Sequence, residues 1–208
     1  LLANMAGFYA AYHGAEGLRK ISSKILWHRQ TLLLALKWCG IEVDDWEGFD
    51  TVRFKSDKHV EGFNCRYENG WIIISIDECT TLDEIADIVQ TQIDFIPDPK
   101  TITHVEPAMK DYKWQHTPLR KKPWLQQEVF NKYHSETNMM RYINELVQKD
   151  FSLVNGMIPL GSCTMKLNAA AELMPVSWSE FANLHPFITS GQALCYQKIM
   201  DDLIKWLC

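Results

Sequence analysis

Residues 66–76 read RYENGWIIISI, and this stretch decides which kind of fold the sequence forms. Two runs of β-forming residues, Gly62 to Tyr67 and Trp71 to Ile76, flank Glu68-Asn69-Gly70. An Asn-Gly dipeptide between two such runs is a strong hairpin signal. A third run, Thr51 to Phe54, precedes them in the chain. The sequence therefore predicts a small antiparallel sheet.

A helix is expected directly after this sheet. Thr81-Leu82-Asp83-Glu84 has the composition of a capping box, in which the first hydroxyl and the last carboxylate each satisfy a backbone N–H group at the helix start. Ile85, Ile88 and Val89 follow at helical spacing, so one face of the helix is apolar. We predict an α+β unit from Ile41 to about Ile93.

Two helical segments are predicted before the sheet. Leu1 to His13 is rich in Leu, Ala and Met and stops at Gly14, a residue type that often ends helices. A second helix is expected from about Glu16 to Trp38, where apolar residues recur at three- and four-residue steps and Gly40 follows.

The second part of the chain begins with a predicted linker. Five of the eight prolines are Pro97, Pro99, Pro107, Pro118 and Pro123, and no helical or strand period is sustained between them. Helical patterns return after the linker.

These later helices are predicted at four places. The first helix is expected over Leu125 to Tyr133, and the next is capped by Ser135. A second capping box is expected at Ser177-Trp178-Ser179-Glu180, and Ser190 is expected to cap a final amphipathic helix through Trp206.

Composition and charge exclude several classes of protein. With 47% apolar and 23% charged residues, the chain has the composition of a folded globular protein. Its net charge is −5, and the one basic cluster is Arg120, Lys121 and Lys122, so nucleic acid is not an expected partner. The longest apolar run, Leu32 to Leu36, is far shorter than the roughly 20 residues that cross a bilayer. No membrane span is expected.

The six cysteines stand apart in the sequence, without a Cys-x-x-Cys pair, so no metal site is expected. A chain of this length does not need disulfides to fold. We interpret the cysteines as mostly buried thiols in a reducing compartment.

The run MIPLGSCTMKLN, residues 157–168, has an unusual composition for a connecting segment. Gly161 permits close approach of a ligand, while Ser162, Cys163 and Thr164 place two hydroxyls and a thiol together and Lys166 adds a positive charge. Such a cluster suits a phosphate or a carboxylate. The alternative is a turn before a helix, since the run lacks the full spacing of a P-loop.

Three segments carry a resemblance to a known family. Tyr133-His134-Ser135-Glu136-Thr137 followed by Met140-Arg141-Tyr142, the run 157–168, and Asn183 with His185-Pro186-Phe187 resemble the P-protein of the glycine cleavage system, a pyridoxal-phosphate glycine decarboxylase. Weaker similarity extends back through Tyr12-His13-Gly14 to the hairpin. The resemblance covers essentially the whole chain.

The resemblance implies an internal piece of a longer polypeptide with two halves. The whole protein is expected to be α/β, a fold-type I pyridoxal-phosphate enzyme, and this piece to be a small α+β domain, a proline-containing linker and a mainly helical segment. Residues 1–95 are expected to end the first half, residues 96–123 to form the linker, and residues 124–208 to open the catalytic half.

The resemblance also implies the chemistry. Glycine loses CO₂ on pyridoxal 5'-phosphate, and its aminomethyl group passes to the lipoyl group of H-protein. The Schiff-base lysine of the family lies outside this chain, so we expect no catalytic residue here and an inactive isolated chain. Cofactor or substrate contact is expected from the pocket-lining loop, namely Ser162, Cys163, Thr164, Lys166 and Asn168, and His134 is a further candidate.

Partners and location follow from the same resemblance. H-protein, glycine, the other glycine cleavage components and a second copy in a homodimer are the expected partners. The compartment would be the mitochondrial matrix in a eukaryote and the cytoplasm in a bacterium.

Arg141 has two interpretations, an anion contact or an ordinary salt bridge with Glu145 at i+4.

Two other functions remain open on the sequence. One is a non-catalytic module that docks a lipoyl carrier or partner subunit through Trp114, Trp124, Trp178 and Trp206, although core packing is the favoured interpretation of these residues. The other is a different fold-type I decarboxylase or transferase, which the twelve-residue run disfavours.

Overall fold

A computed structural model describes residues 1–93, 120–151, 155–156, 169–185 and 188–208. The chain divides into two compact units. One contains residues 1–18 and 123–186, and the other contains residues 19–122 and 187–208. The predicted linker, apart from its last few residues, lies outside the described residues, and the assignment of residues 1–95 and 124–208 to two halves of a longer enzyme stays a prediction.

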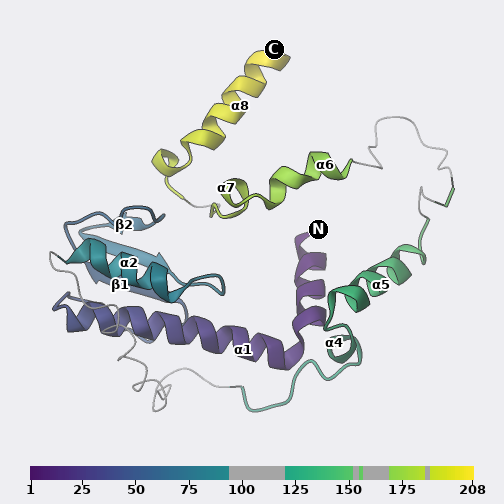
Figure 1. The fold of residues 1–208 in the computed structure, drawn as a ribbon, viewed down its shortest axis with the longest axis horizontal. Coiled ribbons are helices and arrows are strands. Elements are labelled where there is room, and N and C mark those ends of the chain that lie inside the picture. Colours follow the sequence, from purple (N-terminus) through teal and green to yellow (C-terminus); the bar gives the residue numbers. More distant parts are fainter. Residues whose placement is uncertain (94–119, 152–154, 157–168, 186–187) are drawn as a thin grey trace. The chain divides into compact units, whose positions relative to one another are not determined.

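The second unit contains the predicted sheet (Figure 1). Strands β1 (Thr51–Lys55), β2 (Arg66–Glu68) and β3 (Trp71–Ser75) lie in the order β1-β3-β2 and all pairs are antiparallel. Asn69 and Gly70 have φ of 51° and 77°, which are the values of a type I′ hairpin turn. The hairpin prediction is confirmed. Strand β2 is shorter than the predicted 62–67 run, because pairing with β3 begins only at Arg66.

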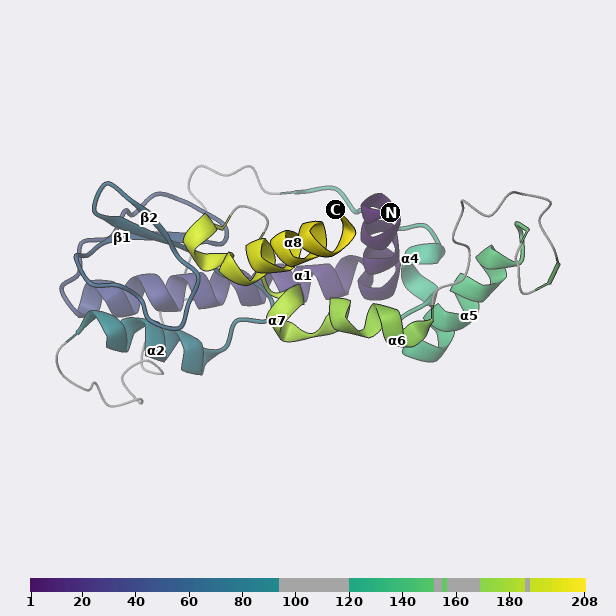
Figure 2. The same ribbon diagram turned by 90° about the horizontal axis from the view of Figure 1, so that it is seen from above.

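One face of the sheet is buried, since Val52 and Phe54 of β1 lie opposite Ile74 and Ile72 of β3. From residue 19 onward, helix α1 (Leu2–Trp38) runs beside α2 (Leu82–Gln92), as Figure 2 shows from above. Their apolar residues join the strands in one core cluster, whose buried members are Ile25, Leu32, Ala35, Leu36, Val52, Phe54, Val60, Cys65, Ile72, Ile74, Ile76, Ile85, Ile88 and Val89. The α+β prediction for this region is confirmed.

The ends of the two core helices match their sequence signals. Thr81 and Glu84 form the capping box of α2, with a Thr81 Oγ1 to Glu84 N distance of 3.2 Å and a Glu84 Oε2 to Thr81 N distance of 2.8 Å. After α1, Gly40 has φ of 76°, and the Ile41 N–H donates to the Leu36 carbonyl at 3.0 Å. This is a Schellman motif, in which glycine adopts the left-handed conformation without a Cβ clash.

Arg29 is a buried cation that the sequence patterns did not single out. It is 1% exposed, and its guanidinium donates to the carbonyl oxygens of Thr51 at 2.9 Å and Trp46 at 2.8 Å. These bonds tie helix α1 to the segment that leads into β1. Such charge-assisted bonds compensate the desolvation of the guanidinium.

The first unit is helical in its described parts. It contains the start of α1, α4 (Val129–Lys132), α5 (Glu136–Val147), α6 (Ala170–Leu173), a short 3-10 turn η2 (Met174–Ser177) and α7 (Ser179–Ala182). The Ser135 hydroxyl accepts from Asn138 N at 3.3 Å, so the predicted cap of α5 is confirmed. The predicted helix over 125–133 is limited to the four residues of α4.

Two predicted caps are wrong. Helix α7 begins at Ser179 without a side-chain cap, because Ser177 belongs to η2 and its hydroxyl donates to the Met174 carbonyl at 2.8 Å. The final helix, α8 (Leu194–Leu207), also begins without a side-chain cap, because Ser190 starts a separate 3-10 turn, η3 (Ser190–Gln192). A local turn competes with each hydroxyl for the capping role.

The cysteine interpretation is also corrected. Among the described cysteines, which are all free thiols, Cys65 is buried and Cys39 is half-buried, whereas Cys79, Cys195 and Cys208 are exposed. Burial raises the pKa of Cys65 to about 11, against the opposing effect of a Tyr67 hydrogen bond, so its thiol stays protonated.

None of the described helices is both long and apolar enough to cross a bilayer.

Candidate functional site

Helix α1 is kinked at Gly14, and this kink organises the described part of the first unit. Gly14 has φ of 59° and ψ of −174°, a backbone conformation that is essentially restricted to glycine. The prediction that a helix is interrupted at Gly14 is therefore confirmed, although the break is a kink inside one long helix. A Cβ at this position would lie 2.5 Å from the Phe130 carbonyl oxygen and 2.9 Å from His134 Cε1.

His134 is fixed against the kink by a hydrogen bond. Its Nδ1 lies 2.6 Å from the carbonyl oxygen of Tyr12. A carbonyl oxygen only accepts, so Nδ1 carries the proton and donates. In the neutral imidazole, Nε2 is then the acceptor and is left to a further donor. We call this contact of His134 with Tyr12 and Gly14 the kink clasp.

Aromatic side chains extend the kink clasp along α1 and α5. Phe8 contacts Tyr142 edge to face, with ring centroids 6.2 Å apart, and Tyr142 stacks on Tyr133 at 4.2 Å. His13 packs on Tyr9, with ring centroids 4.3 Å apart. Such ring pairs each contribute roughly 0.5–1.5 kcal/mol beyond the area they bury. The clasp thus joins residues that are more than 100 positions apart in sequence.

Most of the candidate site residues belong to the 157–168 run. Ser162, Cys163, Thr164, Lys166 and Asn168 lie outside the described residues. Their assignment as cofactor contacts stays a prediction. His134 is the one candidate that the structure describes, and its Nδ1 is engaged by the chain itself.

The described residues around α5 include a hollow that the sequence patterns did not reveal. It has a volume of about 500 Å³ and is lined by Glu136, Thr137, Met140, Arg141 and Asn144. The salt bridge of Arg141 with Glu145, one of its two expected readings, is not among the ion pairs of the described residues. The helical spacing of these five residues places them on one face of α5. This spacing is the signal that the sequence analysis did not use.

The four tryptophans of the docking alternative differ in exposure. Trp178 is 49% and Trp206 is 76% exposed, and Trp124 is half-buried. Trp114 lies outside the described residues. The core-packing interpretation is therefore wrong for Trp178 and Trp206 within the described chain.

In the described residues, no cluster of His, Cys, Asp or Glu side chains has the geometry of a metal site.

Comparison with known proteins identifies relatives along the whole chain. The family described as "Glycine cleavage system P-protein" matches residues 1–92. "Glycine dehydrogenase (decarboxylating)" of Parasynechococcus marenigrum is 44% identical over 223 aligned residues, which cover 100% of this chain and 23% of that protein. The mitochondrial protein of the same name from Solanum tuberosum is 42% identical, with 100% and 21% covered.

A third relative, "Glycine dehydrogenase (decarboxylating)" of Vibrio parahaemolyticus, is 42% identical over 220 residues, with 100% of this chain and 23% of that protein covered. The chain thus spans less than a quarter of the length of these curated relatives. Identity above 40% over alignments that cover the whole chain does not arise by chance. The resemblance found in the sequence is therefore confirmed. Over its whole length the chain is similar to proteins named glycine dehydrogenase (decarboxylating), and its first 92 residues match the glycine cleavage system P-protein family.

Proposed function

We propose that this chain is part of a glycine decarboxylase that uses pyridoxal 5'-phosphate, releases CO₂ from glycine and transfers the aminomethyl group to the lipoyl group of H-protein. The observation that carries the proposal is the 41–44% identity, over essentially the entire chain, to proteins named glycine dehydrogenase (decarboxylating). The complete protein would be an α/β enzyme of fold-type I. It would act with H-protein and the other glycine cleavage components, as a homodimer.

The chemistry of the 162–168 residues supports a cofactor contact. Ser162 and Thr164 supply hydroxyl donors and Lys166 supplies a positive charge, which together suit a phosphate dianion. Cys163 and Asn168 add a weak and a strong polar contact in the same run. When bound, the pyridoxal ring supplies an electron sink for the pair released as CO₂ leaves.

His134 is the proposed contact outside that run. The kink clasp fixes its imidazole plane and leaves Nε2 for a donor on the cofactor or substrate. His134 thus contributes orientation and a hydrogen bond, and no proton transfer is assigned to it. The compartment would be the mitochondrial matrix in a eukaryote and the cytoplasm in a bacterium; the name of the plant relative contains the word "mitochondrial".

The proposal is tested with the full-length protein from which the chain comes. We expect it to exchange labelled CO₂ with the carboxyl carbon of glycine when pyridoxal 5'-phosphate and H-protein are present. The isolated 208-residue chain should show neither cofactor absorbance nor exchange, because the Schiff-base lysine is expected elsewhere. Absence of exchange in the full-length protein would overturn the proposed activity, and exchange by the isolated chain would overturn the expected position of the lysine.

A pair of lysine variants tests the proposed phosphate contact. Lys166→Gln in the full-length protein should weaken cofactor retention by about ten- to a hundredfold, the usual effect of removing a charged hydrogen-bond partner. Lys149→Gln is the matched control, because Lys149 is exposed just after α5. Equal retention in both variants would remove Lys166 from the cofactor site.

A second candidate function is a docking surface for a lipoyl carrier or a partner subunit. The large exposure of Trp178 and Trp206 favours it, because exposed tryptophans often anchor interfaces. Titrating the isolated chain with lipoylated H-protein would separate the two functions. Binding that Trp206→Ala weakens, without catalysis, would support docking by this piece alone, and no binding would leave only the enzyme.

A further inference from the structure

The hollow on α5 gathers polar side chains on one helical face. Thr137, Arg141 and Asn144 lie at spacings of four and three residues, so they form a single stripe along the helix. The opposite side of α5 supplies the buried Met139 and the stacked ring of Tyr142. Packing in the first unit therefore uses one face of α5 and leaves the stripe facing the hollow, whose volume is about 500 Å³.

Arg141 is unpaired among the described residues. Its guanidinium has neither an ion pair nor a hydrogen bond there, although Glu145 lies one turn away on the same helix. Other i,i+4 pairs do close in this chain, namely Lys132 with Glu128 at 3.4 Å and Lys198 with Asp202 at 2.8 Å. The open guanidinium of Arg141 is thus a feature of its site, and it presents a planar set of donors to the hollow.

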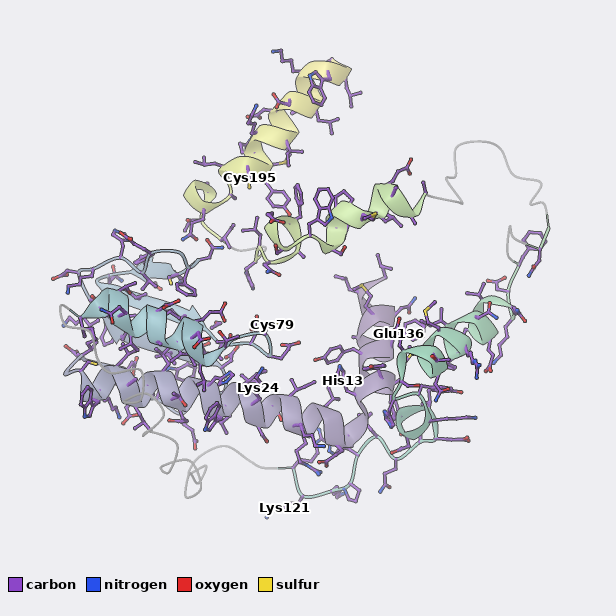
Figure 3. The ribbon with its side chains drawn as sticks, in the orientation of Figure 1. His13, Lys24, Cys79, Lys121, Glu136 and Cys195 are labelled. Atoms are coloured by element: carbon purple, nitrogen blue, oxygen red, sulfur yellow. The ribbon has the colours of Figure 1, made fainter. Side chains whose placement is uncertain are left out.

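The other lining residues restrict what the hollow accepts. The Thr137 hydroxyl and the Asn144 amide add donors beside Arg141, while the Met140 side chain, 62% exposed, adds an apolar surface. Glu136 stands at the first position of α5, where Figure 3 labels it, and also has no partner among the described residues. Its carboxylate repels a dianion and attracts an ammonium group.

From this arrangement we propose that the hollow on α5 binds small carboxylates through Arg141, Thr137 and Asn144, and prefers amino carboxylates whose ammonium group meets Glu136. Arg141 and Glu136 are five residues apart, which is about 7.5 Å along a helix axis. Five residues also turn by about 140° around the helix, so the two long side chains must swing toward each other across the hollow for a short amino carboxylate to bridge them. The site does not depend on the proposed activity, since a simple carboxylate such as acetate is sufficient to occupy it.

The test is an NMR titration of the full-length protein from which the chain comes, with acetate, β-alanine and inorganic phosphate at constant ionic strength. We expect saturable shifts of the Arg141 side-chain N–H, Thr137 and Asn144 signals with acetate, tighter binding of β-alanine, and weaker binding of phosphate. Arg141→Gln should weaken acetate binding by at least about tenfold, and Arg141→Lys should restore part of it. Lys149→Gln is the control and should leave binding unchanged.

A second variant tests the preference for amino carboxylates. Glu136→Gln should remove the advantage of β-alanine over acetate while leaving acetate binding in place. Shifts that do not saturate, or that persist in Arg141→Gln, would overturn the site. An unchanged preference in Glu136→Gln would overturn the role of the ammonium group. Since all of these side chains are exposed, circular dichroism should show unchanged helix content in each variant.

Discussion

The α+β region and the helical region around α5 are built by different means. In residues 19–93, apolar residues from two helices and three strands form one buried cluster. In the described residues from 120 onward, Met139 alone is buried, and aromatic pairs and the kink clasp carry the contacts. The first region owes its stability to burial of apolar area, and the second to a few specific contacts.

Truncation of the core should have the largest effect on this comparison. Phe54 is 0% exposed and packs on the buried face of the sheet. We expect Phe54→Ala to reduce the free energy of unfolding by about 3–5 kcal/mol, measured by urea denaturation. Ile204→Ala is the control, because Ile204 is 61% exposed on α8 and its loss should stay within about 0.5 kcal/mol. Equal effects would show that burial does not determine how much stability a side chain contributes.

Substitution at the kink tests the second region. Gly14→Ala places a methyl group against the Phe130 carbonyl and forces a side chain into a glycine conformation. We expect a loss of at least about 2 kcal/mol, read from faster amide hydrogen exchange in α5. Gly7→Ala lies in the same helix with open space around it, and should be neutral or stabilise by up to about 1 kcal/mol. If exchange in α5 were unchanged in Gly14→Ala, the clasp would have no energetic role.

Loss of a helix cap should have a smaller effect. Thr81→Ala removes the hydroxyl that accepts from Glu84 N, and should reduce the free energy of unfolding by about 1 kcal/mol. Ser177→Ala is the informative comparison, because Ser177 caps no helix and donates only to its own turn. A loss in Ser177→Ala as large as in Thr81→Ala would contradict the assignment of the two caps.

The smallest expected effect depends on pH and comes from His28. This residue is 3% exposed, and its Nδ1 has no hydrogen-bond partner within the described residues. Burial and, to a smaller extent, the charge of Lys24 lower the pKa of His28 below 6.5, while Glu84 opposes the shift. Below about pH 6.5, His28 therefore binds a proton in the unfolded chain more readily than in the folded chain. The free energy of unfolding falls as the pH drops through this range.

The measurement is the urea midpoint of the wild type and of His28→Gln between pH 8 and pH 5. The wild type should lose more stability than the variant across this range, because glutamine does not titrate. The other six histidines are the same in both proteins, so their contributions cancel in the difference. Parallel curves would mean that His28 is protonated in the fold without cost.

The sequence predicted the regions whose signals are local. The Asn69-Gly70 turn, the Thr81 capping box and the β-forming run of β1 are each set by neighbouring residues, and all three are present in the structure. Ser177 and Ser190 resembled caps, but each residue lies in a 3-10 turn, a choice that a four-residue pattern does not resolve. Arg29 and the kink clasp depend on partners 17 to 122 positions away, which periodicity does not reveal.

The kink clasp also has a consequence for how the chain is made. The Tyr12 carbonyl meets His134 only after a further 122 residues have left the ribosome. At about 5–20 residues per second, the first helical segment waits for roughly 6–24 s before its partner exists. During that interval, Phe8 lacks its ring contact with Tyr142. The early segment therefore stays without its partner for much longer than the sheet and its two helices, whose core is completed within 75 residues.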